Sequence, residues 1–371
     1  MIESGEFYRA LATNGVSFYA GVPDSLLCDF ISYLLDNTSD HVITANEGAA
    51  IGLAAGHYLA TGRVSLVYLQ NSGLGNAVNP LMSLMDQEVY GLPVILLVGW
   101  RGEAGVPDEP QHVKQGRITP LLLETLEIPY AILPGPEASL DRTVAEVVEA
   151  ARRRSSPYAL LVRRNAFVKR VPERAVACPY ELSREAAVAS IVERAPLKTA
   201  FVATTGMLAR ELFECRERAR RGHDQDFLCL GSMGHASQIA LGIARSGRSV
   251  YCLDGDGAAI MHMGAFAIIG QQQPESFVHV VINNGAHDSV GGQPTAGFGV
   301  DFPQIALACG YRTALRADTL TALQTCLGQL RAARGPALLE VRVHGGSRFD
   351  LGRPTIATAD AKRAFMRFLA K

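Results

Sequence analysis

SVYCLDGDG at residues 249–257 and VINN at residues 281–284 are the two stretches that decide the fold. Each is a short apolar run that ends in polar residues, which is typical of a buried strand in a parallel sheet. The carboxyl ends of parallel strands meet at one edge of the sheet, and ligands bind beyond that edge. We therefore expect Asp256 and Asn284 to lie close together.

The rest of the chain repeats this alternation of short apolar runs with Ala-rich or amphipathic segments, which predicts parallel sheets covered by helices on both faces. Strands are predicted at residues 17–20, 42–45, 65–69, 94–98, 131–133, 158–162, 199–203, 227–230, 249–253, 279–282, 311–314 and 337–343. They predict an α/β protein with two doubly wound parallel-sheet domains, at residues 1–168 and 185–371. A polar, proline-bearing linker is expected at residues 169–184.

Composition limits the kinds of partner that the protein can have. Hydrophobic residues make up 48% of the 371 residues and charged residues 19%, which allows large cores and argues against disorder. A formal net charge of −1, with the signs interspersed, offers no basic surface for nucleic acid or a membrane. No leader-like segment opens the chain and no apolar run approaches about 18 residues. We therefore expect a cytoplasmic protein that acts on a small molecule.

The two motifs carry the residue types of a metal and diphosphate site. The Asp256 carboxylate and the Asn284 amide offer the oxygen ligands that Mg²⁺ prefers to share with phosphates. Gly255 and Gly257 allow the backbone to approach a diphosphate at the start of a helix, which is expected at residues 258–270. Gly-Asp-Gly alone is usually a tight turn, and paired asparagines alone usually satisfy a loop. The two motifs together, each following an apolar strand, favour the metal site.

The spacing of these motifs resembles the signature of the thiamine diphosphate enzymes, in which Gly-Asp-Gly is followed by Asn-Asn at a similar distance. The resemblance implies that Mg²⁺ binds Asp256, Asn284 and the backbone carbonyl of Ala286. It implies cofactor contacts for Thr205, Gly206, Ser232, Met233, Gly234, Gly255, Asp256, Gly257, Ala258 and Asn284. Met233 would wedge between the two rings of the cofactor, although it could also be a core methionine on a Gly-rich turn. Many family members have a serine where this chain has Ala258, so one contact to phosphate is lost.

The run VITANEGAAIGLAAG at residues 42–56 places an acid, Glu47, between a strand and a Gly/Ala-rich helix. In the family this acid hydrogen-bonds N1′ of the pyrimidine ring, which makes Glu47 the residue on which activation of the cofactor depends. The alternative is a glutamate at a helix start, favoured there by the helix dipole. Because the cofactor of this family spans a subunit interface, the resemblance also implies an obligate homo-oligomer, with a dimer as the minimum active unit.

The chain has no room for the middle domain that most 2-oxo acid decarboxylases of the family carry. Its compact arrangement resembles the phosphonopyruvate and sulfopyruvate decarboxylases, and the runs that carry the resemblance are GVPDS at 21–25, QNSGLGN at 70–76, DEPQH at 108–112, GSMGH at 231–235, NNGAHDSVGGQP at 283–294 and LGRP at 351–354. The last two favour the phosphonopyruvate branch. The implied reaction is non-oxidative decarboxylation of 3-phosphonopyruvate to phosphonoacetaldehyde and CO₂ through a thiamine diphosphate ylid.

A small anionic 2-oxo acid must be met by cations or by many hydrogen-bond donors. Candidate substrate residues are Ser25, Asn71, Ser72, His112, His287, Ser289, Gln293 and Arg353, each of which could instead be a satisfied loop residue. His112 is the candidate proton donor, because imidazole carries protons near neutral pH.

Four other functions compete with this interpretation. Within the family, sulfopyruvate decarboxylase and an acetolactate synthase-like carboligase are alternatives. A non-catalytic subunit that binds the cofactor is a third, and the presence of both Glu47 and the metal motif on one chain argues against it. A nicotinamide-binding Rossmann protein is disfavoured because no Gly-x-Gly-x-x-Gly opens a helix after a strand.

Overall fold

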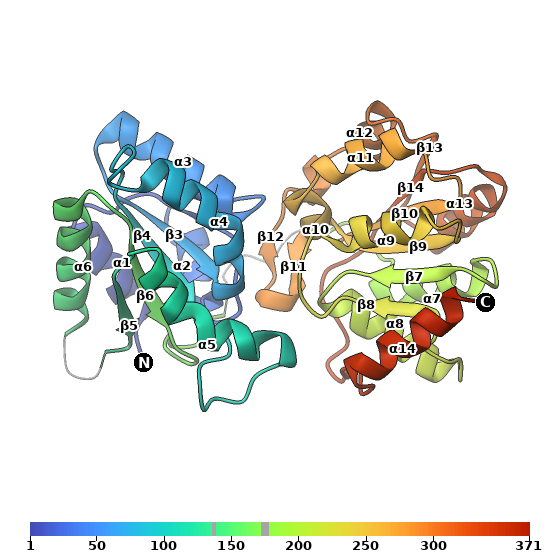
Figure 1. The fold of residues 1–371 in the computed structure, drawn as a ribbon, viewed down its shortest axis with the longest axis horizontal. Helices are drawn as coiled ribbons and strands as arrows, with labels where there is room; N and C mark the ends of the chain where they lie inside the picture. The colour runs from blue at the N-terminus through green and yellow to red at the C-terminus, as the bar shows by residue number, and fades with distance from the viewer. Residues whose placement is uncertain (136–138, 172–177) are drawn as a thin grey trace. The chain divides into compact units, whose positions relative to one another are not determined.

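The computed structural model describes residues 1–135, 139–171 and 178–371, and the chain divides into two compact units, Met1–Ala175 and Val176–Lys371 (Figure 1). The division falls within the predicted linker at residues 169–184, of which residues 172–177 lie outside the described residues. The limits of the linker and of the two domains stay predictions.

The first unit is built on a six-stranded parallel sheet in the order β2-β1-β3-β4-β6-β5. Its strands are β1 (Tyr19–Gly21), β2 (His41–Ile43), β3 (Ser65–Gln70), β4 (Val94–Gly99), β5 (Tyr130–Leu133) and β6 (Tyr158–Val162). The central strands β3 and β4 are buried along nearly their whole length, which explains their continuous apolar sequence.

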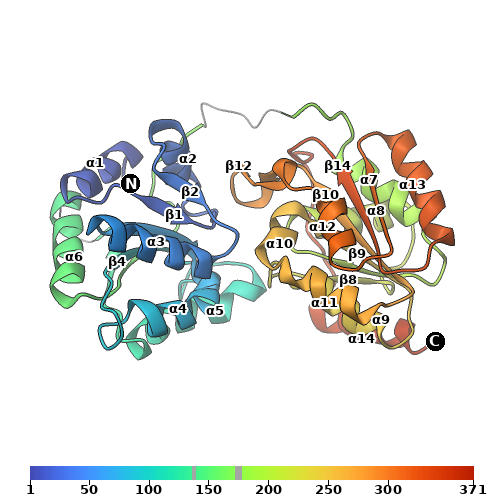
Figure 2. The same cartoon turned by 90° about the horizontal axis from the view of Figure 1, so that it is seen from above.

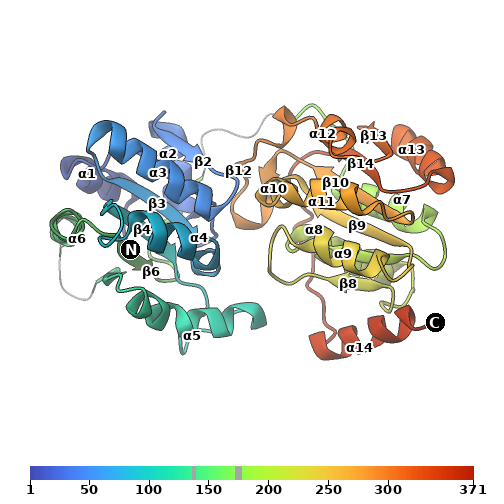
Figure 3. The same cartoon turned by 45° about the horizontal axis from the view of Figure 1, so that its top comes forward.

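Helices cover both faces of this sheet. One core lies under α1 (Ser4–Thr13), α2 (Cys28–Asn37) and α6 (Leu140–Arg154). The other lies under α3 (Glu47–Thr61), η1 (Asn71–Gly73), α4 (Leu74–Pro80), η2 (Leu81–Met85) and α5 (Pro110–Thr125). Helices α3 and α4 lie side by side on this second face (Figure 3).

The second unit repeats the plan with a six-stranded parallel sheet in the order β13-β14-β10-β9-β7-β8. Its strands are β7 (Ala200–Ala203), β8 (Asp226–Leu228), β9 (Val250–Gly255), β10 (Phe277–Asn283), β13 (Thr313–Ala317) and β14 (Ala337–Arg342). A short antiparallel pair, β11 (Ala286–His287) and β12 (Gln293–Pro294), follows β10 and encloses η3 (Asp288–Val290).

Two helical layers again cover the sheet (Figure 2). Helices α7 (Arg184–Arg194), α8 (Met207–Arg218) and α13 (Leu320–Ala332) bury one face. On the other face lie α9 (Ala236–Ala244), α10 (Asp256–Met261), α11 (Gly264–Gln272), η4 (Gly297–Gly299), α12 (Phe302–Ala308) and α14 (Thr358–Leu369).

The predicted fold class is confirmed: the structure has two doubly wound parallel sheets and, across the described residues, no middle domain between them. Every predicted strand has a counterpart, with ends displaced by a few residues. The helix expected at residues 258–270 is two helices, α10 and α11, separated at His262 and Met263. In the part of the chain that the structure describes, no helix is long and apolar enough to cross a membrane.

Candidate active site

The two motifs of the second unit meet where β9 and β10 end. The strands are paired in parallel with Ile282 opposite Gly255, so the residues that follow them are neighbours. The carboxyl group of Asp256 accepts a hydrogen bond from the backbone N–H of Asn284. The structure therefore brings together the acid and the amide that the sequence placed at adjacent strand ends.

Asp256 is a buried acid at the start of α10. It is 2% exposed, and burial raises its pKa to about 6, against the hydrogen bonds donated by the Thr295 hydroxyl and by backbone N–H groups. The loop that carries Thr295 also brings Gly297 close, where a Cβ atom would lie 2.6 Å from Asn283 Oδ1 and nearer still to Asp256 Oδ2. A buried carboxyl with a raised pKa is stabilised in its charged form by a bound cation.

The paired asparagines have different surroundings. Asn283 is fully buried, and its Nδ2 donates to Gly297 O and to Glu340 Oε1, each at 2.8 Å. Asn284 donates from Nδ2 to Asp288 Oδ2 at 2.7 Å, and its Oδ1 accepts from the Ala286 N–H at 3.2 Å. The first asparagine thus holds the loop, whereas the second presents an amide oxygen beside Ala286.

The predicted wedge residue lies next to the Gly-Asp-Gly turn. A Cβ atom at Gly257 would lie 2.8 Å from His287 Cε1 and 3.4 Å from Met233 Cε, so these side chains converge on the start of α10. Met233 sits between Ser232 and Gly234, which have positive φ angles of 55° and 83°. Both residues thus have left-handed backbone in the turn after β8. Glycine adopts this conformation without strain, which explains the glycine at position 234.

Other predicted residues of this unit lie around the same turn. Gly206, at the start of α8, would contact Ser289 through a Cβ atom at 3.4 Å, and the preceding Thr205 donates to Leu230 O at 2.8 Å. The β11–β12 pair places Gln293 opposite His287. Arg353 is exposed in the segment after β14.

Glu47 occupies the first turn of α3 and is 5% exposed. Burial raises its pKa, although the hydrogen bond that Asn76 Nδ2 donates to Glu47 Oε2 at 2.7 Å opposes the rise. A Cβ atom at Gly73 would lie 2.6 Å from Glu47 Cδ. The Glu47 carboxyl therefore lies between Asn76 of α4, which donates a hydrogen bond to it, and Gly73, where a side chain would collide with it.

A second polar group of the first unit surrounds Arg101, which follows β4. Its Nη1 donates to Ser25 Oγ at 2.9 Å, and its Nε donates to Asp108 Oδ2 at 2.8 Å. Asn71 Nδ2 donates to Arg101 O at 2.8 Å, and the neighbouring Ser72 Oγ accepts from Gln70 Nε2 at 2.5 Å. The ends of β1, β3 and β4 thus supply a cation and several donors at one edge of the sheet.

His112 belongs to this group through its charge interactions with Arg101 and Asp108. Burial, and then the charge of Arg101, lower its pKa to about 4, and its Nδ1 is buried without a partner among the described residues. The ring is therefore neutral at pH 7 in the free protein. The role of His112 as proton donor stays a prediction.

Asp24 lies beneath the Arg101 group and is fully buried. Burial raises its pKa to about 6, against a hydrogen bond from the Leu26 N–H and the charge of Arg101. Its Oδ2 is buried and has no hydrogen-bond partner in the part of the chain that is described. A protonated carboxyl is therefore available at this edge of the sheet at mildly acidic pH.

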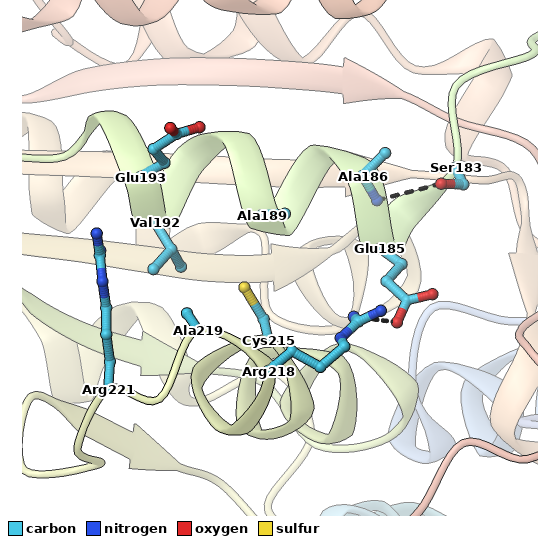
Figure 4. Close-up of a pocket in the computed structure, with 10 residues that line it drawn as sticks. All are labelled: Ser183, Glu185, Ala186, Ala189, Val192, Glu193, Cys215, Arg218, Ala219 and Arg221. Atoms are coloured by element: carbon cyan, nitrogen blue, oxygen red, sulfur yellow. Dashed lines mark hydrogen bonds and ion pairs between the residues drawn. The ribbon is translucent and has the colours of Figure 1, made fainter.

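A cavity of about 580 Å³ lies elsewhere in the second unit, between α7 and α8 (Figure 4). Its lining includes Glu185, Glu193, Cys215, Arg218 and Arg221. None of its ten lining residues is among the predicted site residues, so the cavity is distinct from the converging strand ends.

A buried polar network lies below the Gly-Asp-Gly turn. Asp254 Oδ2 and His279 Nε2 are 3.2 Å apart, and Tyr311 Oη lies 3.3 Å from His279 Nδ1. With Cys252 these side chains could approach one metal ion, their ligand atoms lying within 4.8 Å of one another. Since Asp254 and His279 already satisfy each other inside the core, we interpret the group as a hydrogen-bonded network.

Several functional candidates were not predicted from the sequence. Arg101 lies two residues beyond the end of β4, so the strand-end rule that found Asp256 could have found it. Asn76, Asp108 and Asp24 lie within the runs QNSGLGN, DEPQH and GVPDS, whose resemblance implied no role for them. Burial alone distinguishes Asp24 from an ordinary loop acid.

Both halves of the chain are similar to known proteins. Residues 5–121 match the family model of the thiamine pyrophosphate enzyme N-terminal TPP binding domain, and residues 202–341 match the C-terminal TPP binding domain. A phosphonopyruvate decarboxylase of Streptomyces viridochromogenes is 34% identical, over 100% of this chain and 95% of the relative. One of Streptomyces hygroscopicus is 34% identical over 99% of this chain and 94% of its own. A sulfopyruvate decarboxylase of Methanosarcina acetivorans is 27% identical over 90% of this chain and 89% of its own.

Both halves of the chain thus match thiamine diphosphate-binding domains, in the order N-terminal and then C-terminal TPP binding domain, and the Streptomyces viridochromogenes relative matches the whole chain. The chain belongs to the family of thiamine diphosphate-dependent decarboxylases that includes the phosphonopyruvate and sulfopyruvate decarboxylases.

Proposed function

We propose that the protein decarboxylates 3-phosphonopyruvate to phosphonoacetaldehyde and CO₂, using thiamine diphosphate and Mg²⁺. The observation that carries the proposal is identity of 34% along the whole chain with two relatives named phosphonopyruvate decarboxylase. The more distant sulfopyruvate decarboxylase, at 27% identity, supports sulfopyruvate as the second candidate substrate.

Asp256, Asn284 and the carbonyl of Ala286 would hold the Mg²⁺ ion. Their oxygens are the hard ligands that this cation requires. The raised pKa of Asp256 supports the assignment, because a bound cation relieves the cost of burying the charged carboxylate. Residues that would contact the cofactor are Thr205, Gly206, Ser232, Met233, Gly234, Gly255, Gly257 and Ala258.

Thiamine diphosphate, when bound, supplies the electron sink that allows CO₂ to leave a 2-oxo acid. Glu47 would share a proton with the pyrimidine N1′, because a carboxyl with a raised pKa holds its proton more readily near neutral pH. Asn76 and Gly73 keep the Glu47 carboxyl in place. Met233, beside the Gly-Asp-Gly turn, would orient the two rings.

The polar group around Arg101 would bind the anionic end of the substrate. Its guanidinium is oriented by Asp108, and Ser25 and Asn71 add polar groups at the same edge of the sheet. A bound dianion would favour the protonated form of His112, because an opposite charge nearby raises the pKa of a histidine. His112 would then hold a proton in the substrate complex. The assigned substrate residues of the second unit are His287, Ser289, Gln293 and Arg353.

The active unit would be a homo-oligomer that shares its active sites between subunits. Helix α3, which begins at Glu47, exposes Ala49, Gly52, Leu53, Gly56 and Leu59 at helical spacing. Leu59 is 70% exposed on this face. A contiguous apolar face on an otherwise buried helix is typical of a surface that packs against a second subunit, and we assign a second copy of this chain to it.

The test is a substrate panel on the purified full-length protein with thiamine diphosphate and Mg²⁺. Phosphonopyruvate, sulfopyruvate and pyruvate with an acceptor aldehyde or 2-oxo acid are compared, and products are followed by ³¹P and ¹H NMR. Phosphonoacetaldehyde formation with the highest kcat/KM supports the proposal. Preference for sulfopyruvate would reassign the substrate, and a condensed product would identify a carboligase. No turnover of any acid, despite bound cofactor, would favour a non-catalytic subunit.

A further inference from the structure

Asp288, in η3, joins three separate segments of the second unit through one oxygen atom. Its Oδ2 accepts hydrogen bonds from Asn284 Nδ2 at 2.7 Å, from Arg184 Nη1 at 2.7 Å and from the Gly346 N–H at 2.9 Å. The Asp288 side chain is 12% exposed. The loop after β10, the start of α7 and the segment after β14 therefore meet at this carboxylate.

This contact decides which way the Asn284 amide points. An ionised carboxylate oxygen only accepts hydrogen bonds, so the atom of Asn284 that faces Asp288 must be the amide nitrogen. The amide oxygen then lies on the opposite side, where it accepts from the Ala286 N–H at 3.2 Å. If the Asn284 amide turned by 180°, its oxygen would face Asp288 Oδ2, and the hydrogen bond between the two side chains would be lost.

Asp288 is itself held by a buried arginine. The Arg184 side chain is 7% exposed, and it makes a two-pronged contact with Glu211 of α8, with Nε to Oε2 at 2.7 Å and Nη2 to Oε1 at 3.0 Å. A planar guanidinium fixed by such a fork has little freedom to turn. Its third nitrogen therefore presents a fixed donor to Asp288.

The geometry points to Asp288, fixed by Arg184, as a positioning residue for the metal site. Asp288 contacts neither substrate nor cofactor in this role; it turns the oxygen of Asn284 toward the cation that Asp256 and Ala286 share. The inference rests on the proposed function, since it assigns a role relative to the Mg²⁺ site. Loss of a group that orients a metal ligand typically weakens metal binding by about 10- to 100-fold.

The test compares Asp288→Ala with Asp226→Asn, in the full-length protein. Each change removes a carboxylate that pairs with an arginine of the second unit, Arg184 for Asp288 and Arg216 for Asp226, but Asp288 is the one that contacts Asn284. Mg²⁺ is titrated calorimetrically at a fixed saturating concentration of thiamine diphosphate, and thermal unfolding is recorded without ligands. We expect Asp288→Ala to bind Mg²⁺ about 10- to 100-fold more weakly, and Asp226→Asn to stay within about 3-fold of the wild type.

Two results would overturn the inference. One is wild-type Mg²⁺ affinity in Asp288→Ala, and the other is an equal loss in Asp226→Asn, which would reveal general damage to the domain. Should Asp288→Ala not fold, Asp288→Leu fills a similar volume without a hydrogen-bond acceptor, and wild-type Mg²⁺ affinity in that variant overturns the inference equally. Absence of Mg²⁺-dependent cofactor binding in the wild type would overturn the proposed function as well, which separates the two failures.

Discussion

Gly73→Ala should disable the enzyme through the position of Glu47. A Cβ atom at residue 73 would lie 2.6 Å from Glu47 Cδ and 2.7 Å from Cγ, whereas ordinary contacts begin at 3.4 Å. The Glu47 carboxyl must therefore move by about 1 Å, out of its hydrogen bond with Asn76, because close-packed interiors leave no slack. Overpacking of this kind costs about 1–3 kcal/mol of unfolding free energy, and a reacting group displaced by about 1 Å loses about 100-fold in rate.

Gly75→Ala is the matched control for this change. Gly75 lies in α4, two residues beyond Gly73, and a Cβ atom there would meet nothing within 4 Å. Replacing a helical glycine with alanine adds about 0.5–1 kcal/mol of stability, and Gly75→Ala should keep wild-type turnover. Steady-state decarboxylation at saturating thiamine diphosphate and Mg²⁺ gives kcat, and urea unfolding gives stability. Wild-type kcat in Gly73→Ala would refute the reasoning, since Glu47 would then tolerate displacement.

Three further predictions concern the acids and the α3 surface. Glu47→Gln should keep cofactor binding by calorimetry but lose most of kcat; near-normal turnover would remove Glu47 from the mechanism. Asp24 has a folded pKa of about 6 against a usual 3.8. The protonated carboxyl therefore stabilises the fold fully below about pH 4, and this stabilisation is lost as the pH rises through about 6. The loss is about 3 kcal/mol of unfolding free energy. Urea unfolding at pH 4.5 and 7 should show a smaller pH dependence in Asp24→Asn, and an unchanged slope would contradict the shift. Leu53→Asp should dissociate the oligomer in sedimentation experiments, whereas Leu197→Asp, at a residue that is 95% exposed, should leave it intact; equal behaviour of the two would argue against the α3 face.

The strands and the metal motif could be predicted because both depend on local sequence. Strand β9 is buried on both faces of the sheet, and this burial explains why nearly all its residues are apolar. Parallel pairing of β9 and β10 then places Asp256 and Asn284 at adjacent strand ends. Two residues that are distant in the sequence are therefore in contact. The short pair β11–β12 was missed, because two residues per strand are too few to show a period.

The sequence by itself determined the two doubly wound sheets, the family and the residue types at the strand ends. Only the tertiary structure showed that Gly73 and Asn76 hold Glu47, that Arg101 gathers Ser25 and Asn71, and that Arg184 reaches Asp288 across 104 positions of the chain. The physical reason is the range of the interactions. Hydrophobic periodicity is set by neighbours along the chain, whereas the orientation of a buried polar side chain is set by partners that folding alone brings within hydrogen-bond distance.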